Sequence, residues 1–154
     1  MNSPEPCESC RLIAERDRDN APLWDCILRA DYFDVVHVQS GSLPGWIVLV
    51  VRRHISAIDE LTEKESLELG DLLRRVSLGL KEITGCEKTY VMQFAEAPGH
   101  NHVHFHVVPR ASDMPENMKG ANVFNYLREG EDVPETEKNR IAGELLGFLT
   151  LGKL

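Results

Sequence analysis

Three histidines alternate with apolar residues in the stretch His-Val-His-Phe-His that spans positions 102–106. Alternate side chains of a β-strand point to the same face, so His102, His104 and His106 are predicted to share one face of a sheet. His100 has the same parity and lies just before this strand. Imidazoles are poor core side chains, and neighbouring imidazolium charges repel each other. The row therefore indicates a functional site rather than a structural one.

Two kinds of chemistry suit such a row of imidazoles. Histidines at positions i and i+2 can bind one metal ion, because a neutral ring nitrogen is a common metal ligand. Alternatively, a neutral imidazole can attack phosphorus as a nucleophile while a neighbouring histidine donates a hydrogen bond to the phosphate. The spacing of the histidines fits both readings.

A second group of reactive residues lies near the N-terminus, where Cys7-Glu8-Ser9-Cys10 has the C-x2-C spacing. Two thiolates at this spacing can hold one zinc ion, and a redox role is the competing interpretation. The sequence has no second pair of this kind, so two further zinc ligands would have to be distant in the chain. Cys26 and Cys86 stand among apolar residues and are predicted to be small core side chains.

The composition indicates one globular domain over residues 1–154, since 42% of the residues are hydrophobic. The formal net charge of −8 comes from dispersed acidic residues and disfavours binding to nucleic acid, whose affinity depends on lysine and arginine. No apolar stretch approaches the roughly 18 residues of a membrane-spanning helix. The N-terminal residues do not resemble a signal peptide. We therefore expect a cytoplasmic protein that binds neither nucleic acid nor membrane.

The hydrophobic pattern predicts an α+β fold in which an antiparallel sheet of about five strands packs on one long helix, with a C-terminal helix and a short N-terminal segment. Strands are expected at residues 24–30, 33–39, 46–52, 89–94 and 102–108. Helices are expected at residues 7–16, 62–83 and 135–149. The Pro-, Asn- and Gly-rich segment 111–134 is expected to be an irregular flap.

The long helix carries the clearest signals. Thr62 followed by Glu65 has the spacing of a capping box, which satisfies the free N–H groups at a helix start. Gly85 is a typical residue just past a helix end. Between them, leucines and other apolar residues recur at helical spacing and predict one buried stripe. The alternating apolar side chains of the histidine strand are expected to pack against it.

The run His-Val-His-Phe-His-Val-Val at 102–108, followed by Pro-Arg, resembles the motif of the histidine triad (HIT) family. Upstream segments are also similar to the strand, loop and strand of that family, and the resemblance spans about residues 7–110, with a weaker match in the tail. These upstream segments are Pro44-Gly45-Trp46 through Val51, Arg53-His54-Ile55 and Met92-Gln93.

This resemblance implies a HIT-like fold and a homodimeric nucleotidyl hydrolase or transferase. Its substrate would be a nucleotide conjugate cleaved at the α-phosphate, for example a dinucleoside polyphosphate such as diadenosine tetraphosphate. His104 would attack phosphorus and form a nucleotidyl-histidine, with its other ring nitrogen held by a backbone carbonyl of the same strand. His106 would donate to the phosphate. Gln93 falls where the family places an amide near the phosphates or ribose, and His100 is a further candidate for substrate binding.

The N-terminal cysteine pair extends the resemblance to the zinc-containing, bacterial-type branch of the family. That branch completes its metal site with one histidine after the central strand and with the first histidine of the triad. Carried over by position, the resemblance implies a structural Zn2+ bound by Cys7, Cys10, His54 and His102. His102 would then serve the metal, while His104 and His106 would serve the phosphate.

The sequence departs from the family pattern at two positions. Many members carry a fourth histidine where this chain has Trp46, and an indole cannot accept a proton, so no proton relay is expected there. Trp46 is expected either to wall the site or to fill the core. Gly99 stands where many members carry a Ser or Thr that assists the leaving group, and His100 is the candidate substitute.

Two other functions fit parts of the pattern. A zinc-dependent hydrolase using the histidine row as ligands would need an open metal position and a nearby carboxylate, but the sequence has no Asp or Glu between Ala97 and Ser112. A non-catalytic nucleotide-binding module would have little use for the middle histidine. The nucleotidyl hydrolase or transferase is therefore the preferred hypothesis.

Overall fold

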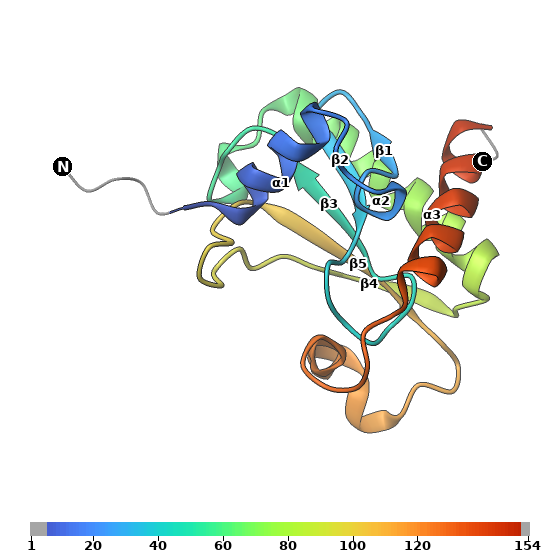
Figure 1. Cartoon of the computed structure of the whole chain (residues 1–154). Helices are drawn as coiled ribbons and strands as arrows, with labels where there is room; N and C mark the ends of the chain where they lie inside the picture. Colours follow the sequence, from blue (N-terminus) through green and yellow to red (C-terminus); the bar gives the residue numbers. More distant parts are fainter. Residues whose placement is uncertain (1–5, 152–154) are drawn as a thin grey trace.

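The computed structural model describes residues 6–151, and its centre is one open antiparallel sheet in the order β1-β2-β3-β5-β4. This architecture, with three α-helices and several 3-10 helices around the sheet, confirms the predicted α+β class. Figure 1 shows the strands in the middle of the molecule. The strands are β1 (Leu28–Arg29), β2 (Phe33–His37), β3 (Ile47–Val51), β4 (Lys88–Met92) and β5 (His104–Arg110).

Helices α2 (Glu63–Thr84) and α3 (Glu135–Thr150) lie on the same side of the sheet (Figure 1). Their apolar faces and the apolar face of the strands form the main hydrophobic core. Burial of these side chains supplies most of the driving force for folding. The alternating apolar residues of the histidine strand belong to this core, as predicted: Val103, Phe105 and Val107 pack with Leu72, Val76 and Leu80 of α2.

The ends of α2 follow the predicted signals. The Thr62 hydroxyl accepts a hydrogen bond from the Glu65 N–H, and the Glu65 carboxylate accepts one from the Thr62 N–H. Gly85 ends the helix in the left-handed conformation at φ 70°, which costs glycine little. The capping box and the C-terminal glycine thus fix the length of the helix that supports β5.

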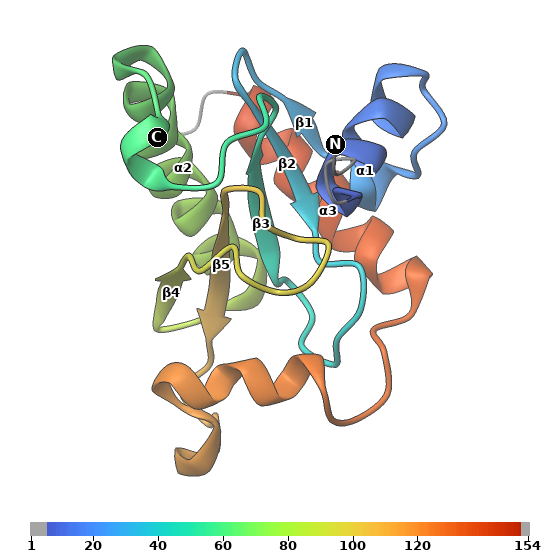
Figure 2. The ribbon, with the colours of Figure 1, turned by 90° about the vertical axis from the view of Figure 1, so that its left-hand side faces the viewer.

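The opposite face of the sheet is covered only near its ends. Helix α1 (Glu8–Asp17) lies near one end and the 3-10 helix η4 (Gly120–Leu127) near the other (Figure 2). A smaller hydrophobic cluster that includes Trp46, Val48 and Val123 joins these elements to the strands. The middle of this face carries the imidazoles of the histidine strand.

The predicted strand over residues 24–30 is mostly wrong. A 3-10 helix spans Leu23–Asp25, and only Leu28–Arg29 pair with β2. The buried Arg16 guanidinium binds both the backbone carbonyl and the carboxylate of Asp25, at 2.6 and 2.9 Å. The Nε–H of Arg16 thus occupies the backbone carbonyl of Asp25, which a neighbouring strand would need in a sheet.

Most other element boundaries differ only slightly from those predicted. Strand β5 begins at His104, because the N–H of His102 bonds the carbonyl of His100 rather than a neighbouring strand. Among residues 6–151, none of the helices combines the length and the apolar character that crossing a membrane requires.

Candidate active site and metal centre

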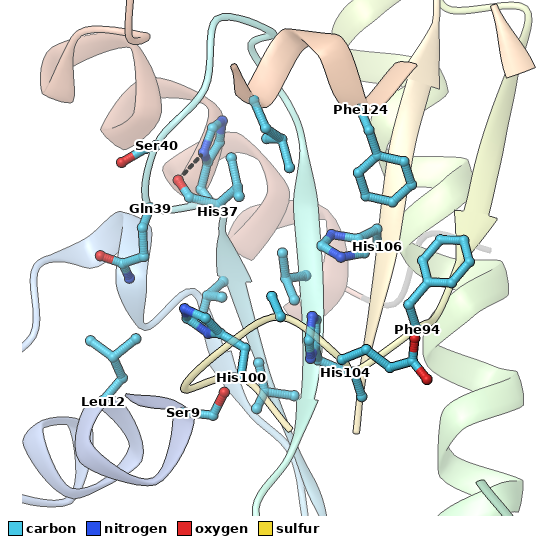
Figure 3. Close-up of a pocket in the computed structure, with 18 of the residues that line it drawn as sticks. Ser9, Leu12, His37, Gln39, Ser40, Phe94, His100, His104, His106 and Phe124 are labelled. Atoms are coloured by element: carbon cyan, nitrogen blue, oxygen red, sulfur yellow. Dashed lines mark hydrogen bonds between the residues drawn. The ribbon is translucent and has the colours of Figure 1, made fainter. Parts of the chain in front are cut away.

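A cavity of about 700 Å³ opens on the face of the sheet that α2 and α3 leave uncovered. Figure 3 shows the rings of His104 and His106 side by side in this cavity, with Gln39 and Ser40 toward one side and Phe94 and Phe124 toward the other. A hollow of this size and mixed lining is typical of a small-molecule site.

His104 presents a defined ring nitrogen to this cavity. Its Nδ1–H donates a hydrogen bond to the backbone carbonyl of His102 at 2.6 Å. A neutral imidazole carries one proton, so Nε2 holds the lone pair. Burial lowers the pKa of His104, which keeps the ring neutral near pH 7. The hydrogen bond to a carbonyl of the triad segment is the one that the family resemblance implied, and it makes Nε2 available as a nucleophile or a proton acceptor.

His106 is held by a different partner. The indole Nε1–H of Trp46 donates to Nδ1 of His106 at 3.0 Å, and the two rings meet edge to face with centroids 5.6 Å apart. Burial, and next the neighbouring His104, lower the pKa of His106 to about 3. Trp46 is fully buried. Trp46 therefore contacts a triad histidine directly, which the sequence interpretation as wall or filler did not include.

An aromatic wall stands beside His106. Phe124 of η4 contacts the rings of His106 and Trp46, with centroid distances of 5.4 and 5.7 Å. Phe94, which follows β4, packs against Phe124 and is 62% exposed. Sequence reasoning missed this wall because Phe124 lies in the segment 111–134, which shows no clear periodicity and no motif.

The other side of the cavity rests on a buried ionic network. The side-chain amide N–H of Gln39 donates to Asp25 at 2.6 Å, and Asp25 is also paired with Arg16. Lys138 of α3 donates to the backbone carbonyl of Gln39 at 2.5 Å. The bond to Asp25 uses the side-chain nitrogen of Gln39 as a donor, so the side-chain oxygen of Gln39 is left as an acceptor. The network is formed by tertiary contacts and leaves no sequence signature.

Two residues predicted to bind substrate lie in different surroundings. His100 lines the cavity. Gln93 follows the end of β4, is half-buried, and is not among the residues that line this cavity. The roles of both residues in substrate binding stay predictions.

The structure brings Cys7, Cys10, His54 and His102 together, with all four donor atoms within 4.8 Å of one another. Each Sγ lies 3.5 Å from Nδ1 of His102. Nδ1 of His54 lies 3.3 Å from Sγ of Cys10 and 3.2 Å from Nδ1 of His102. In a tetrahedral zinc site, the known bond lengths place sulfur and nitrogen about 3.6 Å apart and two nitrogens about 3.3 Å apart. The spacing of the donor atoms therefore fits a zinc ion.

Neighbouring groups orient two of these donors. The Nε2–H of His102 donates to the carbonyl of Val51 at 2.5 Å, which leaves Nδ1 for the cluster. Cys7 caps α1, with its sulfur accepting the N–H of Cys10 at 3.3 Å. Burial and the adjacent Cys7 raise the pKa of the Cys10 thiol to about 11. Such a thiol stays protonated at neutral pH unless a cation lies beside it, so a metal ion bound at the cluster would have to displace its proton.

No family model matches the chain, but comparisons with individual proteins are informative. A histidine triad nucleotide-binding protein from Sulfolobus tokodaii superimposes with a TM-score of 0.69 at 15% identity, covering 92% of this chain and 93% of that one. A zinc-bound histidine triad family protein from Mycobacterium smegmatis gives 0.67 at 15% identity, covering 96% and 97%. The chain has the fold of the histidine triad proteins.

The predicted resemblance to histidine triad proteins is thereby confirmed at the level of the fold. Among curated proteins, a bis(5'-adenosyl)-triphosphatase of Dictyostelium discoideum is 29% identical over 100 residues, which make up 62% of this chain and 67% of that protein.

Proposed function

We propose that this chain is a nucleotidyl hydrolase or transferase that cleaves nucleotide conjugates at the α-phosphate through a nucleotidyl-histidine intermediate. The bond from His104 Nδ1–H to the His102 carbonyl carries the proposal, because it leaves the Nε2 lone pair of a cavity-lining imidazole free to attack. His106 lies beside this nucleophile, with 5.0 Å between the ring centroids. Its position suits a donor to the phosphate.

The reaction divides into two displacements. In the first, Nε2 of His104 forms a bond to the α-phosphorus, and the bond from phosphorus to the leaving group breaks with its electron pair. The positive charge that develops on the imidazole is stabilised by the His102 carbonyl at Nδ1. In the second, water or another acceptor attacks the same phosphorus. The phosphorus–nitrogen bond then breaks, the lone pair returns to Nε2, and the proton lost by the attacking water or other acceptor is released to the solvent.

The substrate class rests on two supports. One relative is named a bis(5'-adenosyl)-triphosphatase. The cavity also offers Phe94 and Phe124 as apolar aromatic surfaces on which a purine can stack, as aromatic side chains do with bases. A dinucleoside polyphosphate, with diadenosine tetraphosphate as the example, is our proposed substrate.

We also propose that Cys7, Cys10, His54 and His102 bind one structural zinc ion. The donor spacing fits a tetrahedral ion, and one structural neighbour is described as zinc-bound. Four side chains would fill all four positions and leave none for water or substrate, which is the arrangement of structural zinc sites. This argues against the alternative of a catalytic zinc hydrolase.

We also propose that the protein is a homodimer, as the family resemblance implies. Strand β4 forms one edge of the sheet, and Val91 on that edge is 47% exposed. An exposed apolar edge strand offers unpaired backbone groups to a second copy. Light scattering coupled to gel filtration would measure the mass in solution, and a monomeric mass at micromolar concentration would contradict this part of the proposal.

The central experiment combines a substrate panel with a trap. Purified protein is incubated with diadenosine tri- and tetraphosphate and an AMP phosphoramidate, and AMP release is followed by chromatography. The reaction is stopped without acid, and mass spectrometry of the protein is used to look for a nucleotidyl adduct on His104. We expect AMP release by the native chain and by Arg74→Ala, an exposed control on α2. Full turnover in His104→Ala would refute the proposal.

A further inference from the structure

Trp46 and His106 face each other across neighbouring strands. Trp46 immediately precedes β3, and the register pairs Val48 of that strand with His106 of β5. This pairing brings the indole Nε1–H within 3.0 Å of His106 Nδ1. Phe124 packs edge to face against both rings. The hydrogen bond is thus enclosed between the sheet and the aromatic wall.

The direction of this hydrogen bond is fixed by chemistry. The indole nitrogen has a proton and no lone pair in the ring plane, so it can only donate. His106 Nδ1 must therefore be the acceptor and carry the lone pair. A neutral imidazole with its lone pair on Nδ1 has its proton on Nε2. A proton on Nδ1 would instead face the indole N–H and leave a buried donor without a partner.

We infer that Trp46 is a positioning residue that locks His106 in the Nε2–H tautomer and so makes it a dedicated hydrogen-bond donor toward the cavity. The tautomer itself follows from the geometry alone. Its use, which is donation to the phosphoryl group under attack, rests on the proposed function. A histidine at position 46 could donate or accept, and only the indole enforces one direction.

These two hydrogen bonds make the two cavity histidines complementary. His104 donates a hydrogen bond from Nδ1–H to a carbonyl and keeps a lone pair on Nε2, whereas His106 accepts a hydrogen bond at Nδ1 and keeps its proton on Nε2. One ring is prepared to attack and the other to donate. Two adjacent rings of the same type thereby acquire opposite roles before any substrate binds.

Nitrogen-15 NMR tests the tautomer on the full chain. Long-range correlations of the imidazole nitrogens, assigned with His106→Asn, report which nitrogen carries the proton. At neutral pH we expect an unprotonated Nδ1 on His106, correlated through the hydrogen bond with the indole Nε1–H of Trp46. A protonated Nδ1 on His106 would overturn the inference, and this test needs no variant of Trp46.

The Trp46→Phe variant tests the role while keeping an aromatic ring. We expect the hydrogen-bonded shift of His106 Nδ1 to disappear, whereas the control Phe124→Leu, which removes a ring contact but no donor, keeps it. Unchanged Nδ1 shifts in a folded Trp46→Phe protein would overturn the inference. If Trp46→Phe does not fold, the protonation state of His106 Nδ1 measured on the native chain decides the inference by itself.

Kinetics tests the link to the proposed function. On an AMP conjugate, Trp46→Phe is expected to lower kcat by about tenfold, and adding it to His106→Asn should cause no further loss because the two residues act as a unit. If the losses of kcat from Trp46→Phe and His106→Asn instead multiply in the double variant, Trp46 does not act through His106 and the positioning role is wrong. If His104→Ala keeps full turnover while NMR shows the Nε2–H tautomer, the proposed function fails and the assignment of the tautomer stands.

Discussion

The metal cluster and the cavity use histidines from one short segment in opposite ways. His102 lies in the cluster and binds the Val51 carbonyl through Nε2, so Nδ1 is left for the thiols. His104 lies in the cavity and binds a carbonyl through Nδ1, so Nε2 is left. The partner of the second ring nitrogen therefore distinguishes the proposed metal ligand from the proposed nucleophile, although the residue type and the parity are the same.

The two regions are also connected by the backbone. The carbonyl that orients His104 belongs to His102, whose ring is part of the cluster. Any displacement of His102 moves this carbonyl. We therefore expect substitutions in the metal cluster to slow the reaction, because they displace the carbonyl that orients His104. Substitutions of the cavity histidines are expected to leave metal binding unchanged.

The largest effect is expected from His104→Ala. Removal of the nucleophile should lower kcat on an AMP conjugate by at least about 10³-fold, since catalysis by the remaining groups is weak. Zinc content, measured by mass spectrometry of the metal, should stay equal to that of the native chain because His104 is not a cluster donor. A variant that loses both activity and zinc would contradict the separation of the two regions.

A smaller loss of activity and a large loss of stability are expected from Cys10→Ser. Loss of a thiolate should release zinc and lower the free energy of unfolding by several kcal/mol, because metal binding is coupled to folding. The rate of AMP release should fall by about tenfold as the His102 carbonyl loses its support. Denaturant unfolding and metal analysis measure these effects. Cys86→Ser, a cysteine outside the cluster, should keep its zinc.

His37 is a buried histidine that lines the cavity beside Gln39 and is not a member of the metal cluster. Burial lowers the pKa of His37 to about 4, while its Nε2 accepts the N–H of Gly45 at 3.1 Å. The unfolded chain binds a proton there near pH 6.5, so this contribution to stability is full above that pH and is lost as the pH falls toward 4.

We expect the native chain to lose about 3 kcal/mol more stability than His37→Gln between pH 7 and 4. Urea unfolding of both proteins at each pH, with equal zinc, isolates this difference. Parallel stability curves would show that His37 does not titrate in this way.

The smallest effect is expected from His54→Ala. His54 is exposed, whereas His102 is fully buried, so water can take the place of the His54 nitrogen. Competition with a chelator should show a zinc affinity reduced by about 10- to 100-fold, with kcat changed less than in Cys10→Ser. An equal loss of zinc and activity in both variants would show that all four ligands contribute alike.

Local signals in the sequence were enough for the main architecture. The two ends of α2 are set by short-range contacts of Thr62, Glu65 and Gly85. On β5, the alternation of residue types determines which side chains face the core. Such features depend on residues that are close in the chain. The metal group was predictable from the family resemblance, because Cys7 and Cys10 alone do not specify their distant partners.

Other features depend on tertiary register. The donor role of Trp46 requires the pairing of β3 with β5, which places the indole beside His106. The failed strand at 24–30 reflects Arg16, whose buried ion pairs with Asp25 and Asp34 form only after the chain has folded. No pattern within one segment encodes these contacts.

The segment that carries the three histidines has a further consequence for how specificity can evolve. His104 and His106 are fixed on the floor of the cavity by a strand that is paired on both sides. The walls come from the turn after β4 and from η4, which contain Phe94 and Phe124. Under the proposed function, substitutions in these walls can select a new leaving group or base while the atoms that react stay in place. Recognition can thus diversify without rebuilding the chemistry.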